Sequence, residues 1–254
     1  MDIYEKLKNK FTSREQINCT VTVLFNEPPL VEQMKSENLD FIVFDMEHGR
    51  YDTQNLIPCL HMCRTAGIPS VVRVQDTAYH LIAKTIDMGA DGIMLPRTET
   101  LEQLGTAIDA MRFFPVGKKG WGGLGQFRKG ESMDEFQKGR YLIPQIESPK
   151  GIENLPKMLD DYADEISAII VGPYDMSVML GTPQDLCSEP MKAAINKVAS
   201  ICAEYKKSFG VYCNNLDEAR MYHKVGANVA WIGTDLGFFM DGYNNVFGSA
   251  LDFE

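Results

Sequence analysis

Residues 141–155 read YLIPQIESPKGIENL, and residues 166–177 read ISAIIVGPYDMS. Each stretch joins a β-rich apolar run to a helical pattern, and each carries a carboxylate, Glu147 or Asp175, just after its apolar run. Consecutive parallel strands that alternate with helices bring such residues to one rim of an α/β barrel. Because barrel enzymes keep their chemistry at that rim, we expect the functional side chains among the strand-end residues.

The rest of the chain repeats this pattern of a short β-branched run followed by a helical segment. Eight strands are predicted, at residues 19–25, 41–47, 70–74, 92–97, 141–147, 166–172, 209–213 and 229–235. Apolar runs buried on both sides suit a barrel or a doubly wound sheet, and eight units favour the barrel. We therefore predict a single (β/α)8 TIM barrel domain over residues 1–254, which is the usual length for this fold.

Two segments depart from this repeat. Residues 113–140 carry seven glycines and little helical periodicity. They are expected either to form a wall or lid of the site or to be a mobile surface loop. The aromatic tail after the last strand, LGFFMDGYNNVFGSALDFE, is expected to pack on its own barrel or on another subunit, because exposed aromatic surface is unfavourable.

Charge and composition restrict the classes of partner and the compartment. The chain has 25 Lys and Arg against 35 Asp and Glu, a net charge of −10 that disfavours nucleic acid and anionic membrane surfaces as partners. No long apolar stretch or signal peptide is recognised, so we predict a cytoplasmic protein. The six cysteines are expected to be reduced, and ordinary helix packing is favoured over a metal cluster for Cys59, His61 and Cys63.

The strand-end residues suggest a metal site and an anion site. Glu147 and Asp175 are hard oxygen ligands, which suit Mg²⁺ or Mn²⁺ better than a structural Zn²⁺. Arg73 lies inside the apolar run SVVRV and needs an anion, either a substrate carboxylate or an internal partner such as Asp45 or Glu47. His48 is either a general base or a structural histidine.

Two absences restrict the chemistry. Schiff-base aldolases on barrels need a lysine that points inward from a strand, and the eight predicted strands contain none. No GxGxxG motif opens a βα unit, so a dinucleotide-binding fingerprint is also missing.

Six segments, in order and at consistent spacing, resemble the HpcH/HpaI aldolases, the metal-dependent pyruvate aldolases of 4-hydroxy-2-oxoheptanedioate and 2-dehydro-3-deoxyglucarate type. The resemblance covers most of the chain. The segments are FDMEHGRYD (44–52), VVRV (71–74), MGADGIMLPRTET (88–100), PQIESPKGIENL (144–155), VGPYDMSVMLG (171–181) and VAWIGTD (229–235).

The resemblance implies reversible cleavage of a 4-hydroxy-2-oxo acid to pyruvate and an aldehyde. Glu147 and Asp175 would bind a divalent metal (Mg²⁺, Mn²⁺ or Co²⁺), Arg73 would polarise the keto oxygen and His48 would transfer protons. Asp87 would orient the histidine across a subunit interface. Three further residues would shape the pyruvate pocket, namely Gln145, Gly172 and Pro173.

Departures from the family pattern bear on specificity. Lys119 stands where an arginine is expected, Tyr174 replaces a small residue and narrows the predicted pocket, and the first strand lacks the usual Gly and Trp. These departures keep a citrate-type Claisen condensation open. Oxaloacetate decarboxylation and a non-catalytic 2-oxo-acid sensor are further alternatives. The resemblance also implies a homo-hexamer, a dimer of trimers, with the C-terminal helical tail exchanged between subunits.

Overall fold

The computed structural model describes residues 2–248, and its centre is a closed barrel of eight parallel strands in the order β1 to β8. This confirms the predicted TIM barrel. The strands are β1 (Ile17–Thr22), β2 (Phe41–Asp45), β3 (Ser70–Arg73), β4 (Gly92–Leu95), β5 (Tyr141–Ile146), β6 (Ala168–Val171), β7 (Ser208–Cys213) and β8 (Val229–Thr234).

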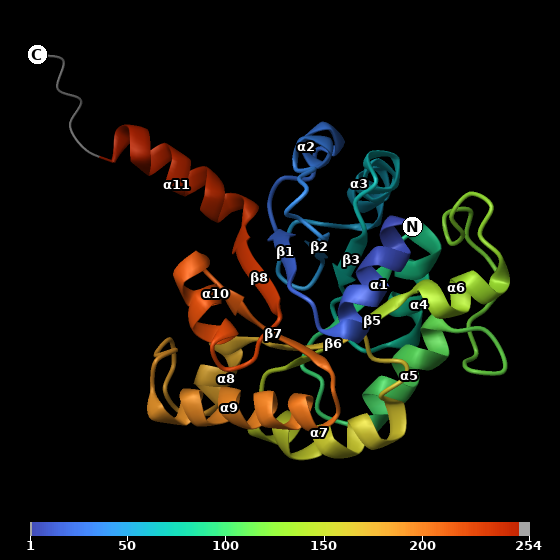
Figure 1. Ribbon diagram of the computed structural model, residues 1–254. Helices are drawn as coiled ribbons and strands as arrows, with labels where there is room; N and C mark the ends of the chain where they lie inside the picture. The colour runs from blue at the N-terminus through green and yellow to red at the C-terminus, as the bar shows by residue number, and fades with distance from the viewer. Residues whose placement is uncertain (1, 249–254) are drawn as a thin grey trace, which may run out of the picture.

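Helices surround the barrel, and most of them connect consecutive strands (Figure 1). Their bounds are α1 (Ile3–Ser13), α2 (Pro28–Gln33), α3 (Thr53–Ala66), α4 (Tyr79–Met88), α5 (Leu101–Met111), α6 (Met133–Gly139), α7 (Pro149–Tyr162), α8 (Pro173–Met179), α9 (Glu189–Glu204), α10 (Leu216–His223) and α11 (Asp235–Phe247).

All eight predicted strands exist, but most end earlier than the apolar runs suggest. The clearest case is β1, which ends at Thr22 instead of continuing to Phe25. The backbone N–H groups of Val23, Leu24 and Phe25 donate to the carboxylate of Asp235 at 2.7–3.0 Å. These donors are therefore satisfied by a side chain and do not extend the strand ladder.

Side-chain alternation along the strands separates an interior core from an outer core. On β5, Tyr141 and Ile143 belong to the cluster inside the barrel, whereas Leu142 and Ile146 belong to the cluster under the surrounding helices. The same two-residue period directs Gln145 inward, towards the barrel axis.

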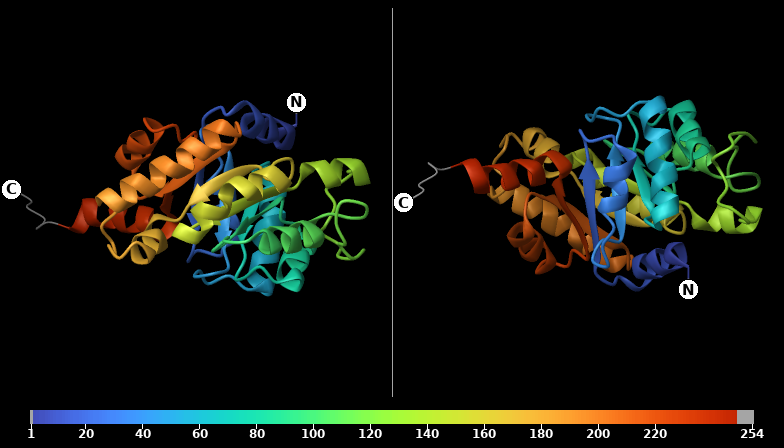
Figure 2. Two further views of the ribbon diagram at one scale, coloured as in Figure 1. Left: turned by 90° about the horizontal axis from the view of Figure 1, so that it is seen from below. Right: turned by 90° about the horizontal axis from the view of Figure 1, so that it is seen from above.

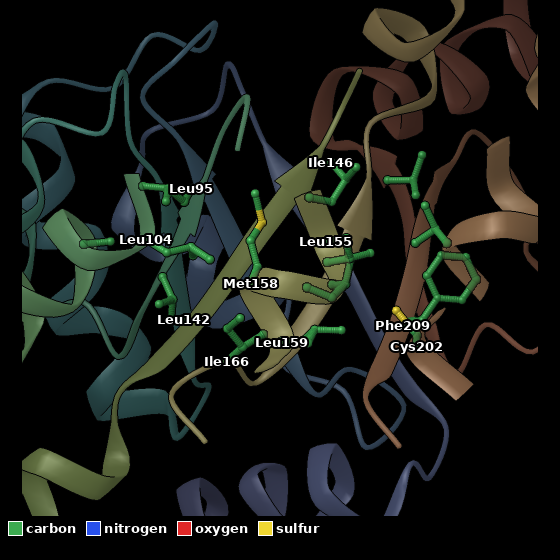
Figure 3. Close-up of a cluster of buried hydrophobic side chains, with 14 of the residues drawn as sticks. Leu95, Leu104, Leu142, Ile146, Leu155, Met158, Leu159, Ile166, Cys202 and Phe209 are labelled. Atoms are coloured by element: carbon green, nitrogen blue, oxygen red, sulfur yellow. The ribbon is translucent and has the colours of Figure 1, made fainter. Parts of the chain in front are cut away.

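The outer core fills the space between the barrel and the helices that cover it (Figure 3). Leu142 and Phe209 of the strands pack there with Leu104 of α5 and with Leu155 and Met158 of α7, and all five side chains are fully buried. Because α7 and α5 are held by this packing, the loops that precede them at the rim have fixed ends.

Residues 113–140 contain more regular structure than their glycine content predicts. Helix α6 forms within them, with a capping box between Ser132 and Glu135. Two aromatic side chains of the preceding segment, Phe113 and Phe127, pack against each other and against Phe136 of α6. Helix propensity over only seven residues is a weak sequence signal, which is why this helix is missed.

Helix α11 projects away from the barrel in every view (Figures 1 and 2). Most of its large apolar side chains are exposed, namely Leu236, Phe238, Phe239, Met240, Tyr243, Val246 and Phe247. The predicted helical tail is thus present up to Phe247, whereas the predicted tail residues 249–254 lie outside the described residues. None of the helices in the part of the chain that is described has the length and apolar character to span a membrane.

Candidate active site

A cavity of about 230 Å³ opens at the rim formed by the C-terminal ends of the strands. It brings together all but one of the predicted site residues. These are His48, Arg73, Gln145, Glu147, Gly172, Pro173, Tyr174 and Asp175. Asp87 is the exception.

Glu147 follows β5 and lies deep in this cavity, with only 4% of its surface exposed. Gln145 Nε2 donates to Glu147 Oε1 at 2.6 Å, and the backbone N–H of Arg97 donates to Glu147 Oε2 at 2.8 Å. Burial raises the pKa of Glu147 to about 8, and the nearby Asp175 carboxylate acts in the same direction. This buried carboxyl group is therefore stabilised in its neutral form.

Asp175 lies in the first turn of α8, close enough to raise the pKa of Glu147, and its side chain is exposed. Two carboxylates that lie close together suit a divalent cation. Among residues 2–248, no ammonium or guanidinium group donates a hydrogen bond to the buried carboxylate of Glu147. That region has no group of three or more His, Cys, Asp or Glu side chains that could hold a metal ion. A cation here would keep open positions for water or substrate.

Gly172 explains how Glu147 and Gln145 fit side by side. A Cβ atom at position 172 would lie 2.2 Å from Glu147 Oε1 and 2.6 Å from Gln145 Nε2. Both distances are far below van der Waals contact, so a side chain here would displace the carboxylate. Glycine at this position is thus required by the packing of the site.

Arg73 pairs with Asp45, one of the internal partners that the sequence suggested. Its Nε donates to Asp45 Oδ1 at 2.9 Å, and its Nη2 donates to Asp45 Oδ2 at 2.6 Å. Burial would lower the pKa of Arg73, but hydrogen bonds and charge from Asp45 outweigh burial and raise it. The guanidinium still has N–H groups outside this pair, and it lines the cavity, so it can also donate to a bound anion.

Glu47 links three basic side chains, of which Arg73 and His48 line the cavity. Its Oε2 lies 3.5 Å from Arg73 Nη1 and 3.8 Å from His48 Nε2, and its Oε1 lies 3.3 Å from Arg97 Nε. The side chain of His48 is 65% exposed, so water reaches its imidazole ring. His48 is thus placed for proton exchange between solvent and a ligand in the cavity.

Asp87 is on α4, outside this cavity, and its carboxylate pairs with Lys119 Nζ at 2.5 Å. Lys119 is the residue that replaces the expected arginine, and its side chain is almost fully buried. Two residues predicted as separate features thus form one ion pair. Within a single chain, Asp87 does not contact His48 among the described interactions.

Sequence reasoning missed the aromatic wall of the cavity. Tyr212 on β7 and Trp231 on β8 line it beside Tyr174, and the Tyr212 and Trp231 rings meet edge to face with centroids 5.1 Å apart. The guanidinium of Arg73 lies 5.7 Å from the Trp231 ring centroid. The available signal was a large aromatic residue at an inward position of each strand.

A second cavity, of about 340 Å³, lies on the other side of Glu147 and Asp175 and shares both residues with the first. Most of its lining residues are polar, among them Thr77, Arg97 and Gln103. The two carboxylates are therefore reachable from two directions.

A family model described as HpcH/HpaI aldolase/citrate lyase matches residues 21–242, which is most of the chain. The chain belongs to this family. As a member of the HpcH/HpaI family with aldolases among its relatives, it is an enzyme of the aldolase class.

Curated relatives support this membership of the HpcH/HpaI family. A 5-keto-4-deoxy-D-glucarate aldolase of Klebsiella pneumoniae is 27% identical, with 88% of each chain covered. A hydroxypyruvate/pyruvate aldolase of Delftia acidovorans is 26% identical, covering 84% of this chain and 80% of that protein. The crystal structure of an HpcH/HpaI aldolase from Desulfitobacterium hafniense superimposes with a TM-score of 0.86 over 98% of both chains at 21% identity, which supports the fold.

Proposed function

We propose that this protein is a divalent-metal-dependent aldolase that cleaves a 4-hydroxy-2-oxo acid reversibly to pyruvate and an aldehyde. The observation that carries the proposal is the convergence of Glu147, Asp175, Arg73 and His48 on one cavity of about 230 Å³. The family membership of the chain and the names of its relatives agree with this chemistry.

Glu147 and Asp175 are proposed as the ligands of Mg²⁺, Mn²⁺ or Co²⁺. The fit rests on the donor set, two carboxylates of which the buried one has its pKa raised by burial and by its acidic neighbour. A nearby cation would favour the ionised form of Glu147 and would thereby lower its raised pKa. When bound, the cation supplies positive charge that stabilises an enolate oxygen.

The side chains of the protein have separate proposed roles in the cleavage. Arg73, held in place by Asp45, donates to the 2-oxo group and stabilises the negative charge that develops there. His48 accepts the proton of the 4-hydroxyl group through water as the bond between C3 and C4 breaks. The electron pair of that bond forms the enolate, which is protonated at C3 to give pyruvate, while the aldehyde leaves.

Gln145, Gly172 and Pro173 are proposed to hold the pyruvate half. Gln145 Oε1 is buried and has no hydrogen-bond donor among the described residues, so it has capacity for a ligand hydroxyl group or a water. Tyr174 lines the cavity with an exposed side chain and is proposed to restrict the aldehyde half.

The test is pyruvate release, coupled to lactate dehydrogenase, from a panel of 4-hydroxy-2-oxo acids and from oxaloacetate. We expect EDTA to abolish release from the hydroxy acids and added Mg²⁺, Mn²⁺ or Co²⁺ to restore it. Glu147→Gln should lose the metal-stimulated rate, whereas the matched control Glu153→Gln, at an exposed position on α7, should keep it. An unchanged rate in a folded Glu147→Gln variant would exclude Glu147 as a ligand.

Release from oxaloacetate alone, or condensation with acetyl-CoA, would instead favour decarboxylation or the citrate-type reaction. Tight 2-oxo-acid binding without turnover, unaffected by His48→Ala, would identify a sensor.

The proposed homo-hexamer with exchanged C-terminal helices rests on the exposed apolar side chains of α11.

A further inference from the structure

A third cavity, also lined mainly by polar residues, lies at the opposite end of the barrel from the candidate active site. It has a volume of about 440 Å³ and is lined by residues that precede β5, β6 and β7, together with one side of α1. The candidate active site is formed by residues that follow the strands, so the two sites are separated by the barrel itself.

The lining of this cavity is strongly basic in a chain whose net charge is −10. Only two acidic residues line it, Asp164 and Glu165. The basic residues are Lys8, Arg112, Lys138, Arg140, Lys206 and Lys207. Such an excess of positive charge in a concave site concentrates anions.

Some of these basic groups already have partners within the protein. Arg140 pairs with both carboxylate oxygens of Glu131 at 2.7 Å each. Lys138 pairs with Asp134, and Lys207 donates to the backbone carbonyls of Ala163 and Ile166 near the end of α7. These three side chains therefore fix the shape of the cavity more than they supply free charge.

Arg112 is the most informative of the six. It is only 5% exposed; its Nε donates to Glu165 at 2.7 Å, and its Nη2 donates to the Arg140 carbonyl at 2.9 Å. Its Nη1 is buried and has no acceptor among residues 2–248. A buried guanidinium N–H without an acceptor is unfavourable, and because Arg112 lines the cavity, an oxyanion there can satisfy this N–H once the side chain turns toward it.

Lys8 and Lys206 supply the charge that remains free. Lys8 projects from α1 and Lys206 from the turn between α9 and β7, and both line the cavity. Neither pairs with a carboxylate within the described part of the chain. Two unpaired ammonium groups and an unsatisfied guanidinium around one cavity match a ligand with more than one negative charge.

We propose that this cavity binds a small polyvalent oxyanion, either a phosphorylated metabolite or a dicarboxylate. Its volume is in the range of small-molecule sites, of order 300–1,000 Å³. On binding, Arg112 turns its free Nη1 toward one oxyanion group, and Lys8 and Lys206 neutralise the remaining charge. The site is distinct from the cavity that holds Glu147.

The test is isothermal titration of the full chain with inorganic pyrophosphate and, separately, with succinate, in the presence of saturating pyruvate. We expect at least one of the two anions to bind with a stoichiometry of one per chain, more weakly at high salt. Binding of pyrophosphate alone identifies the phosphate class, and binding of succinate alone identifies the dicarboxylate class. Absence of saturable binding by both would overturn the proposal.

Variants locate the binding site. The double variant Lys8→Glu/Lys206→Glu should weaken the affinity about tenfold or more, whereas Lys6→Glu, exposed on the same helix but outside the cavity, should leave it unchanged. Arg112→Lys should also weaken anion binding. If that variant does not fold, the affinity of the double variant still tests whether the anion binds in this cavity. Equal affinity of the wild type and a folded double variant would place the anion elsewhere and refute the assignment.

Discussion

The guanidinium of Arg73 is held by the carboxylate of Asp45 through two parallel hydrogen bonds, at 2.9 and 2.6 Å. Asp45 is fully buried at the end of β2, and Arg73 is directly opposite it in the register of β3. This fork geometry fixes the plane of the guanidinium. The remaining N–H groups of Arg73 are therefore presented to the cavity in one orientation.

Replacing Asp45 by Asn removes one side of this pair and leaves Arg73 free to tilt. We expect kcat for pyruvate release to fall about 10- to 100-fold and the free energy of unfolding to fall by about 3 kcal/mol. Asp40→Asn is the matched control, because Asp40 pairs with Lys10 just before the same strand, away from the rim. A folded Asp45→Asn variant with wild-type kcat would refute the positioning role.

Metal affinity should depend on pH through Glu147, whose pKa is about 8. Below this value a cation must displace a proton, so affinity for Mn²⁺ should rise about tenfold per pH unit and level off above pH 8. Titrations by calorimetry between pH 6 and 9 measure the slope. A metal affinity that does not change with pH over this range would contradict the role of Glu147 as a ligand.

The same group makes the metal-free protein less stable as pH rises. Glu147 binds its proton more tightly in the folded than in the unfolded state, so stability is highest below the ordinary pKa of Glu and is lost as pH approaches 8. Denaturation in EDTA should show this decline in the wild type. Glu147→Gln should show a smaller decline, and an identical decline in both proteins would exclude Glu147 as its source.

Gly172→Ala should disrupt the site through one methyl group. The added carbon would overlap Glu147 Oε1, so we expect activity to fall more than about 100-fold and stability to fall by about 1–3 kcal/mol. Gly122→Ala is the control, because a Cβ atom there meets nothing within 4 Å. Steady-state kinetics and chemical denaturation of both variants test the prediction.

Tyr174 should limit the size of the aldehyde. Tyr174→Ala should raise kcat/KM for a bulky aldehyde relative to a small one by about tenfold in condensation with pyruvate. Tyr174→Phe keeps the ring and removes only the hydrogen bond to Asn214. The ratio of kcat/KM for the bulky aldehyde to that for the small one should therefore stay near the wild-type value in this variant. An unchanged ratio in Tyr174→Ala would show that another residue sets the limit.

The exposed apolar side chains of α11 should mediate assembly. Tyr243→Ser combined with Phe247→Ser should reduce the mass measured in solution from that of a hexamer to a smaller species. Asn245→Ser, on the same helix, should leave the mass unchanged. A wild-type protein that is monomeric at all concentrations would contradict the proposed assembly.

Much of the barrel and of its rim was predictable because local patterns determine both. The two-residue period of YLIPQIE directs Gln145 and Glu147 to the same side, and alternating strands and helices bring Asp175 to the same rim. Arg73 was predicted to need an anion, but its choice of Asp45 depends on the register of two strands, which no local pattern fixes.

Other contacts depend on the tertiary structure alone. Arg97 adopts a positive φ of 47°, and its N–H points at Glu147, although nothing in LPRTET indicates either feature. Lys119 meets Asp87 across 32 residues of sequence, and Asp235 binds the backbone after β1 across more than 200. The single domain over residues 1–254, the cytoplasmic location and the absence of nucleic-acid or membrane partners stay predictions.

Asp235 joins the outlying helix to the wall of the cavity. It is the first residue of α11, and its carboxylate fixes Val23, which lines the cavity, together with Leu24 and Phe25. In the proposed hexamer, a shift of α11 on loss of a neighbouring subunit would reach the wall of the cavity through Asp235. Dilution would then lower the turnover of each chain as well as separate the chains, so specific activity would become a function of protein concentration.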